Sequence, residues 1–475
     1  MNARSWLALV TLTGCSLAPR YERPKVAAAR AYKEDGAWKP ARPSDHLLRG
    51  SWWSVFGDPE LDALVTTANG GNQSVAAARA NFKLARALLK QARAGYFPSV
   101  GVTPSVTRSR QPSFDASGAR TGVTSNHLVL PLDATWEPDL WGSVTSSVDS
   151  AKHDAEASFA ELENVRLSVR AEVAFDYFQI RALDGLKEIL DSTVVAYRES
   201  LELAQARFET GLASDQDVAQ AEAQLRSTEA QASDVGIQRA ELEHALAVLM
   251  GKAPSEFTLP ARALSARPVA VPLGVPSTLL ERRPDVAAAE RRVAAANAEI
   301  GIARAAYFPT LTLRGTAGYQ SSSFANLLEW PSFFWSLGAS LGQTLFDGGR
   351  REGLSDQAWA AYEGAVANYR QTVLVAFQEV EDNLVALRLL EEELEDQTAA
   401  VDAANRYLAL ANDRYELGID SYLNVVTAQT TLLGNQRALV NVRLRQMMGS
   451  VGLIKALGGG WNVSTLDRAT SDSGK

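Results

Sequence analysis

The chain contains one long motif twice, and this duplication limits the possible folds more than any other feature of the sequence. The first copy centres on Arg207-Phe208-Glu209-Thr210-Gly211 and the second on Arg414-Tyr415-Glu416-Leu417-Gly418. The spacing is constant, because 414 − 207 and 418 − 211 both equal 207. Self-similarity at one fixed spacing is the signature of repeated supersecondary units. The sequence therefore predicts two equivalent structural repeats, each with a turn at the Arg-aromatic-x-x-Gly motif.

Long proline-free segments flank each of these turns. Residues 143–210 and 351–417 contain no proline, so each can form one helix of about 67 residues, roughly 100 Å long at ~1.5 Å per residue. Return helices are predicted over 215–250 and 421–457. A helix of this length cannot bury its apolar stripe alone. We therefore expect each long helix to pack against neighbours along its length.

A shorter helix precedes each long one, at a matching place in each repeat. Apolar residues recur at three- and four-residue steps over 74–96 and 286–307, which predicts two amphipathic helices. They end at Tyr96-Phe97-Pro98 and Tyr307-Phe308-Pro309, because a proline disfavours helix in the residue before it. Asp58-Pro59 likewise suits the N-cap and first position of an earlier helix.

After each Tyr-Phe-Pro sequence the apolar period changes to two, which predicts strands. Apolar residues alternate with small or polar ones over 128–136, 311–319 and 335–341, and more weakly over 100–106. Each repeat thus supplies one predicted β-hairpin, giving four strands per chain. The predicted hairpin loops are Ser109–Ser125 and Gln320–Pro331.

The alternating strands fit either a membrane barrel, with lipid outside and water inside, or a half-buried soluble sheet. No stretch of 18 or more apolar residues follows the N-terminal segment, so a membrane span would have to be a closed barrel. Four strands are too few to close one, and the interior of an eight-stranded barrel is filled by side chains. An open channel would therefore need at least three copies of the chain.

The N-terminus has the layout of a secretory signal peptide. Arg4 precedes a short apolar run and small residues before Cys15. Leu12-Thr13-Gly14-Cys15 resembles the lipobox of bacterial lipoproteins, in which the cysteine is lipidated, and the following Ser16 resembles an outer-membrane address. Cys15 is the only cysteine, so no intramolecular disulfide can form. The alternative is a chance cysteine within a signal peptide.

Charge and residue spacing argue against several other classes of function. The net charge of −8 offers no basic footprint for nucleic acid. His46, His127, His153 and His244 are scattered, without the spacing of a metal site or a Ser/His/Asp triad. No glycine-rich phosphate loop follows a strand. We therefore expect no enzyme activity, no metal, no nucleic-acid partner and no cofactor other than a covalent lipid on Cys15.

Taken together, these segments resemble the TolC-type outer-membrane factors, in the lipoprotein branch that serves tripartite multidrug efflux pumps. The resemblance covers essentially the whole mature chain, and the combination of motifs is specific although each is weak alone. The matching motifs are Leu12–Cys15, Trp52-Trp53, Phe56–Pro59, Pro276–Asp285, Tyr307–Pro309, Phe346–Arg350 and Ala456–Trp461.

The resemblance implies a mainly α fold with a β-barrel part. In that family three copies form a 12-stranded outer-membrane barrel and an α-barrel tunnel that crosses the periplasm. The implied function is passive export of drugs or other small molecules. The implied partners are outer-membrane lipid, two further copies of the chain, a periplasmic adaptor protein and an inner-membrane RND-type transporter.

The resemblance also implies roles for residues at the repeated turns, which would be the periplasmic tips. Arg414, Tyr415 and Leu423 match residues of the family's gate. Where the family commonly has an acidic residue in the constriction, this chain has Thr427, which puts a cation-selecting acidic ring in doubt. Asp420 lies nearby as a possible substitute. The plainer alternative for Arg414 is a solvated charge at a helix C-terminus.

The remaining turn residues are candidates for contact with the adaptor. Arg207, Phe208, Gly211 and Gly418 are the predicted docking residues. Both glycines also suit helix C-caps, which is compatible with docking. Simple packing is the alternative for Phe208 and for Tyr415.

The predicted organisation is a signal peptide (1–14), a lipid-anchored tether (15–58), two repeats (59–270 and 271–457) and a C-terminal tail (458–475). The leading hypothesis is the exit duct of a tripartite efflux pump in the outer membrane. One alternative is a lipid-anchored periplasmic coiled-coil scaffold without a pore. Another keeps the duct but assigns it to protein secretion or metal-ion export.

Overall fold

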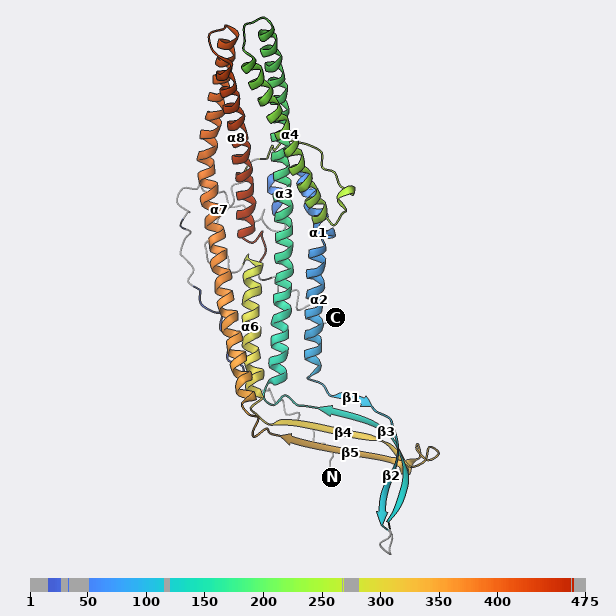
Figure 1. Cartoon of the computed structure of the whole chain (residues 1–475). Helices are drawn as coiled ribbons and strands as arrows, with labels where there is room; N and C mark the ends of the chain where they lie inside the picture. The colour runs from blue at the N-terminus through green and yellow to red at the C-terminus, as the bar shows by residue number, and fades with distance from the viewer. Residues whose placement is uncertain are drawn as a thin grey trace. The chain divides into compact units, whose positions relative to one another are not determined.

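The computed structural model describes residues 16–26, 33, 51–114, 120–266, 268, 282–462 and 464. Long helices and one antiparallel sheet make up the fold, which confirms the predicted mainly α class with a β part (Figure 1). The helices are α1 Pro59–Gly71, α2 Gln73–Ala94, α3 Ser143–Glu209, α4 Asp215–Leu249, α6 Pro284–Ala305, α7 Arg350–Glu416 and α8 Tyr422–Ala456. The strands are β1 Ser99–Val102, β2 Ser105–Phe114, β3 Arg120–Trp136, β4 Thr310–Ser321 and β5 Phe333–Gly342, with short 3-10 turns at Trp52–Phe56, Pro254–Glu256 and Trp330–Ser332.

Two compact units divide the chain. The sheet unit comprises Met1–Pro24, Phe82–Ala157 and Ala289–Tyr369, and the hairpin unit comprises Lys25–Asn81, Ser158–Ala288 and Arg370–Lys475. Each unit therefore takes segments from both sequence repeats. This follows from the duplication, because a repeat whose helix and hairpin cannot bury themselves must pack against its counterpart.

The sheet is four strand positions wide, as predicted, although it contains five strands. The order is β1-β3-β4-β5, with β2 also paired to β3. Val102 pairs with Leu132 and Ser105 with Val129, so β1 and β2 keep one register and only Thr103-Pro104 interrupts them. Proline has no amide hydrogen to donate, which explains a break at this place.

One predicted loop is wrong. The segment Ser109–Ser125 is mostly strand, because β2 continues to Phe114 and β3 begins at Arg120. Ser109, Ser113, Gly122 and Ser125 suggested a loop but are paired in a long hairpin, in which Ser109 lies opposite Ser125. Backbone pairing overrode local propensity here, as is common for strands. The predicted second loop is nearly right, since β4 ends at Ser321.

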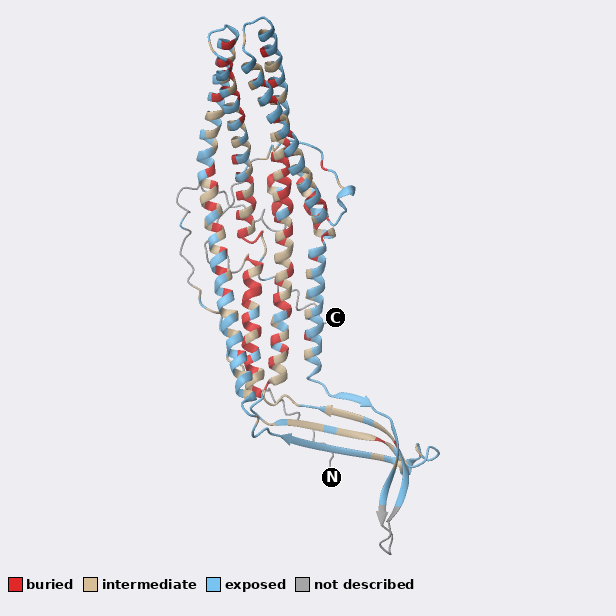
Figure 2. Cartoon of the chain, viewed as in Figure 1, coloured by how far each residue is buried: buried red, intermediate tan, exposed pale blue. Residues whose placement is uncertain are grey.

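The two longest helices match their predicted bounds to within one residue. Asp139 caps the start of α3, where its carboxylate accepts from the amides of Val144 (3.0 Å) and Thr145 (2.7 Å). Asp58 caps α1 as expected, by accepting from the amide of Glu60. In Figure 2 the buried residues gather along the helices, whereas the strands are mostly exposed or intermediate.

In the hairpin unit, a buried ion-pair network binds the segment after α4, around Pro260, to α1, α3 and α4. Arg181 is only 1% exposed and donates to Glu60 (2.6 Å), Asp184 (2.9 Å) and the carbonyl of Pro260 (2.6 Å). Arg239 completes the network through Asp184 at 2.6 Å. Removing one partner would leave an uncompensated buried charge, so the network holds this connector in one place. Nothing in the sequence pattern pointed to it.

No helix among the described residues is both long enough and apolar enough to cross a membrane.

Candidate functional site

The two repeated turns, here called the tip turns (residues 210–214 and 417–421), have the same backbone geometry. Gly211 and Gly418 have φ values of 75° and 73°, in the left-handed region that favours glycine. Leu212 N donates to Arg207 O at 2.8 Å, and Ile419 N donates to Arg414 O at 2.9 Å. The repeat therefore extends to matched hydrogen bonds, and both glycines act as helix C-caps.

The two tip arginines have different partners despite their equivalent positions. Arg207 reaches the other hairpin, where its guanidinium donates to the carbonyls of Tyr415 (2.7 Å) and Glu416 (2.8 Å). It also lies 4.4 Å from the Tyr415 ring centroid. These carbonyls end α7, where helix dipoles favour a cation. Arg207 thus joins the two hairpins, and this set of contacts is called the Arg207 clasp below.

Arg414 instead stays within its own turn. Its Nε donates to Asp420 at 2.5 Å, and the hydrogen bond from Arg414 holds the pKa of that carboxyl below its ordinary value. Arg414 is about half exposed. Asp420 is therefore engaged in an ion pair with Arg414 in this conformation.

Behind the tip turns lies a small core, here called the tip core, in which Tyr415 and Tyr422 are the aromatic residues. Its other buried members are Ala204, Ala221, Ala411, Val425 and Ala428. Their ring centroids are 5.2 Å apart, and both side chains are buried. Burial raises the pKa of Tyr422 to about 12, so its hydroxyl stays protonated. Packing is thus the observed role of Tyr415. Phe208, its counterpart in the first repeat, is 46% exposed.

This core is incompletely paired. Gln429 donates to the hydroxyl oxygen of Ser200 at 3.1 Å, but its own carbonyl oxygen has no protein partner. The Tyr415 hydroxyl and the Gln220 carbonyl oxygen are buried without partners as well. Buried polar groups without partners lower stability. The tip core is therefore less tightly specified than an apolar core would be.

Leu423 and Thr427 lie one turn apart on α8, and both are exposed. The Thr427 hydroxyl donates back to the carbonyl of Leu423 at 2.8 Å, within α8. Whether these residues act as a gate remains a prediction.

The sheet has one apolar and one polar face wherever all four strand positions pair. Directly opposite residues share a face, and Val102, Leu132, Ala317 and Trp335 form one such row. Val129, Pro131 and Phe334 are the apolar exceptions on the polar face. The apolar face carries Val100, Val106, Leu128, Leu130, Trp136, Leu313, Tyr319, Phe333, Leu337 and Leu341, and the polar face carries Thr107, His127, Asp133, Thr135, Thr312, Arg314, Thr316, Gln320, Ser336 and Ser340.

Aromatic residues stand near both ends of the apolar face. At one end the Phe333 ring lies 5.7 Å from Tyr319 and 5.3 Å from Trp330, and at the other end Trp136 pairs with Leu313. Six residues separate Tyr319 from Leu313, or ~20 Å at ~3.3 Å per residue. Aromatic girdles at two levels with apolar residues between them are typical of sheets that face lipid.

The N-terminal segment after Cys15 lies along α6 within the sheet unit. Leu17 O accepts from Arg304 (3.3 Å), Pro19 O accepts from Asn297 (2.8 Å), and the Tyr21 hydroxyl donates to Glu290 (2.5 Å). The segment runs antiparallel to α6, starting at the end that leads into β4. Gly301 permits this approach, because a Cβ there would lie 2.8 Å from that of Ala18. Cys15 itself and the predicted signal peptide lie outside the described residues.

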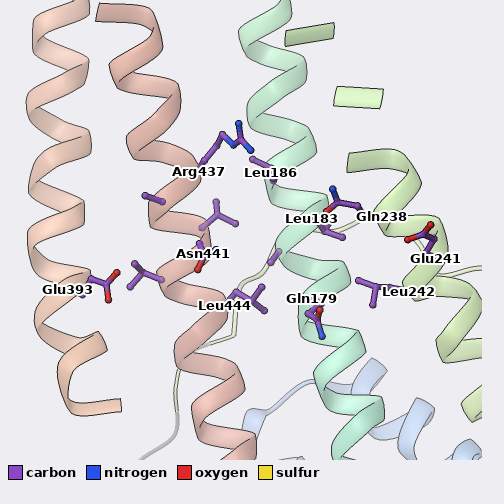
Figure 3. Close-up of a pocket in the computed structure, with 14 residues that line it drawn as sticks. Gln179, Leu183, Leu186, Gln238, Glu241, Leu242, Glu393, Arg437, Asn441 and Leu444 are labelled. Atoms are coloured by element: carbon purple, nitrogen blue, oxygen red, sulfur yellow. The ribbon is translucent and has the colours of Figure 1, made fainter. Parts of the chain in front are cut away.

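A cavity of about 770 Å³ separates the two hairpins within the hairpin unit (Figure 3). Leucines from α3, α4 and α8 line it together with polar side chains such as Glu241, Glu393 and Asn441. Arg437 at its edge donates to Gln231 at 2.7 Å, a polar bridge between α8 and α4. The hairpins are therefore not joined by a continuous apolar core along this stretch.

No group of three or more metal-ligating side chains occurs among the described residues. The chain thus combines an antiparallel sheet that has separate apolar and polar faces with two long helical hairpins, one from each repeat. Comparison with known proteins identifies the class of protein to which this combination belongs.

The chain belongs to the outer membrane efflux protein family, whose model matches residues 64–252 and 275–459. The chain is 33% identical over 456 residues to the probable efflux pump outer membrane protein TtgC of Pseudomonas putida, covering 96% of this chain and 94% of the relative. It is also 33% identical over 459 residues to the outer membrane protein OprJ of Pseudomonas aeruginosa, covering 96% and 95%.

Solved structures agree with this assignment. The outer-membrane channel OprN superposes with a TM-score of 0.87 at 28% identity, covering 94% of this chain and all of the other. The open-state MtrE outer membrane channel of Neisseria gonorrhoeae gives 0.81 at 26% identity, covering 94% and 98%. The chain is therefore an outer-membrane efflux channel, the exit duct of a tripartite pump.

Proposed function

We propose that three copies of the chain assemble into one exit duct that releases drugs or other small apolar molecules. The single observation that carries this proposal is the two-faced sheet. Its ends, β5 on one side and β1 with β2 on the other, are edge strands within one chain. Exposed edges invite pairing with another chain, and closure removes them. Three copies of four strand positions give 12, enough for an open lumen.

The polar face would line the duct and the apolar face would meet lipid. Thr, Ser, Gln and small residues dominate the polar face, so it offers weak and unspecific contacts to a passing solute. Weak binding at many positions favours passage over retention. This supports passive export rather than chemical conversion of the solute.

The cargo and partners are inferred from the relatives. Two of the Pseudomonas putida relatives are named an antibiotic and a toluene efflux pump outer membrane protein. We infer a similar cargo of drug-like or solvent-like molecules, delivered by a periplasmic adaptor and an inner-membrane RND-type transporter. Phe208, at the end of α3 beside the first tip turn, and Leu417, in the second tip turn, are exposed apolar groups that such an adaptor would contact.

The lipid anchor on Cys15 belongs to the same proposal. The carbonyl of Leu17 accepts a hydrogen bond from Arg304, which lies at the end of α6 that leads into β4. Cys15 lies two residues before Leu17 in the chain, so acyl chains on it would be close to the start of the lipid-facing strands. One acyl chain alone binds membranes weakly, but several chains together with the sheet would bind firmly.

The Arg207 clasp supports a closed resting state of the tips. It joins the hairpins by two charge-assisted hydrogen bonds to carbonyls in the last turn of α7. Separation of the hairpins would break both bonds. The partly unpaired core around Tyr415 and Gln429 would oppose this separation less than an apolar core would.

Two measurements test the duct. Deletion of the chain's gene should increase susceptibility to drugs without lowering the abundance of the transporter, and the purified protein should pass current in planar bilayers. A lipid-anchored scaffold would pass no current. Unchanged susceptibility together with absent conductance would refute the proposal. Conductance with unchanged drug susceptibility would keep the duct and reject the drug cargo in favour of another solute.

A further inference from the structure

Within one chain, an aromatic contact closes the seam between the first and second repeats where the sheet meets the helices. Trp141, just before α3, stacks on Phe308 with ring centroids 4.8 Å apart and an interplanar angle of 25°. Its indole Nε1 donates to the carbonyl of Pro309 at 2.7 Å. The residue that leads into the long helix of repeat one thus rests on the Tyr-Phe-Pro sequence of repeat two.

The residues that correspond to this contact at the outer edges of the two repeats are exposed. They are the residues just before α7 in repeat two and the Tyr-Phe-Pro sequence of repeat one. Leu345 and Phe346, just before α7, are 90% and 89% exposed, the highest values among the large hydrophobic side chains of the described residues. Phe97 in the Tyr-Phe-Pro sequence of repeat one is 70% exposed, whereas its counterpart Phe308 is 40% exposed. One chain therefore contains one closed seam and the two halves of another.

Leu345 and Phe346 belong to a turn before α7 that hydrogen bonds hold in place. Arg351 donates to the carbonyl of Thr344 at 2.9 Å and to the carboxylate of Asp347 at 2.6 Å. Asp347 also accepts from the amide of Gly349 at 3.2 Å. Hydrogen bonds on both sides thus fix the backbone that carries Leu345 and Phe346. Their exposure is a feature of an ordered junction.

We propose that Leu345 and Phe346 of one copy pack on Tyr96-Phe97-Pro98 of the next copy, so that the seam between copies repeats the seam within a chain. The two junctions differ in one respect, because Asp347-Gly348 stands where repeat one has Leu140-Trp141. The second junction therefore contributes apolar side chains from the residues before its turn. This inference rests on the proposed function and adds the residues through which the copies meet.

The edge strands support the same pairing of copies. In the chain, β3 of repeat one pairs with β4 of repeat two beside the Trp141 contact. The unpaired edges are β5 of repeat two and β1 with β2 of repeat one. Joining them places the Leu345-Phe346 junction beside Phe97, since β5 leads into that junction and β1 follows Pro98. Contacts of this head-to-tail kind close into a ring when the rotation permits.

Lipid is the competing neighbour for an exposed apolar pair, so the test compares two positions. A photoreactive p-benzoylphenylalanine replaces Phe346 in one full-length variant and Leu337 in another, in native membranes. Leu337 is the matched control, because it is 79% exposed but lies on the apolar face of β5. We expect the Phe346 probe to yield covalent dimers and trimers, with adducts mapped by mass spectrometry to residues 96–98. The Leu337 probe should give at least about tenfold less protein adduct.

A second pair of variants guards against misfolding. Phe97→Ala should reduce the adduct yield at position 346 severalfold while trimers remain detectable, whereas Leu337→Ala should leave the yield unchanged. Adducts at position 346 to lipid alone, or to protein outside residues 96–98, would overturn the contact. If the trimer and its conductance persist in that case, only this inference fails. If neither trimer nor conductance exists, the proposed function fails with it.

Discussion

Arg207 and Arg414 occupy equivalent places in the two repeats but act on different partners. Arg207 joins the hairpins through the carbonyls of Tyr415 and Glu416, whereas Arg414 binds Asp420 in its own turn. The sequence predicted gate roles for Arg414 and Tyr415 and a docking role for Arg207. Both roles remain predictions. The geometry makes Arg207 a residue whose loss would remove a direct contact between the hairpins.

Replacing Arg207 should open the duct more than replacing Arg414. Each charge-assisted hydrogen bond contributes ~1.5–3 kcal/mol, less where water competes, so Arg207→Gln should raise the open-state population by about tenfold. Single-channel recording in planar bilayers measures this. Arg414→Gln is the matched control and should have a smaller effect, because it leaves the clasp intact. Equal conductance of Arg207→Gln and the unmodified protein would remove the clasp from the gate.

Asp176 gives the chain a pH-dependent stability. This carboxyl on α3 is 6% exposed, and burial, reinforced by the charge of Glu172, raises its pKa to about 7 from 3.8. The folded state therefore binds the proton more tightly than the unfolded chain does. Ionisation of Asp176 therefore lowers the free energy of unfolding progressively as the pH rises from about 4 to about 7. Above that range the whole destabilisation is present.

Asp176→Asn should remove this cost. We expect the melting temperature at pH 8 to rise by about 2 °C or more, with little change at pH 4. Differential scanning calorimetry of the protein in detergent at both pH values provides the measurement. Glu172→Gln is the control and should give a smaller rise. A melting temperature at pH 8 that Asp176→Asn leaves unaltered would show that the carboxyl is not strained when charged.

At the scale of the elements, the two hairpins differ where their return helices begin. Ser214 caps α4 in a full capping box, in which its hydroxyl accepts from the amide of Asp217 and the Asp217 carboxylate accepts from the amide of Ser214. Ser421 stands at the same place before α8 but makes no side-chain capping bond. The start of α4 is therefore more strongly capped than the start of α8.

This difference predicts unequal effects of one substitution. Ser214→Ala should destabilise the start of α4 by ~1 kcal/mol, whereas Ser421→Ala should change the start of α8 by much less. Hydrogen exchange of the amides in the first turn of each helix reports this locally. Similar loss of protection in both variants would contradict the assigned caps.

At the scale of the whole molecule, membrane attachment combines the sheet with the predicted lipid. Cys15→Ser should abolish incorporation of radiolabelled palmitate, while the protein still fractionates with the outer membrane because its apolar sheet face remains. Labelling of the variant would place the lipid elsewhere. A variant found only in the soluble periplasmic fraction would show that the sheet alone does not hold the protein in the membrane.

The sequence by itself determined the duplication, the helix bounds and the two-faced strands. These features are periodic and local: a proline-free run extends a helix, glycine ends it, and a period of two assigns strand faces. The Ser109–Ser125 segment shows the limit, because small polar residues suit loops and paired strands equally. Its partner across the hairpin decided which formed.

Only the tertiary structure decided which of two equivalent residues does what. Arg207 and Arg414 occupy the same place in the repeated motif, yet one meets a helix end and the other its own turn, where Asp420 stands in place of Ala213. The sequence around Trp141 likewise does not identify its partners, yet this side chain stacks on Phe308 and donates to the carbonyl of Pro309. The physical reason is that the two repeats of one chain meet at only one place, where β3 pairs with β4. The other edge of each repeat, β1 with β2 in the first and β5 in the second, has no partner within the chain. Equivalent sequences therefore occupy unequal surroundings, and contact partners depend on those surroundings rather than on local pattern.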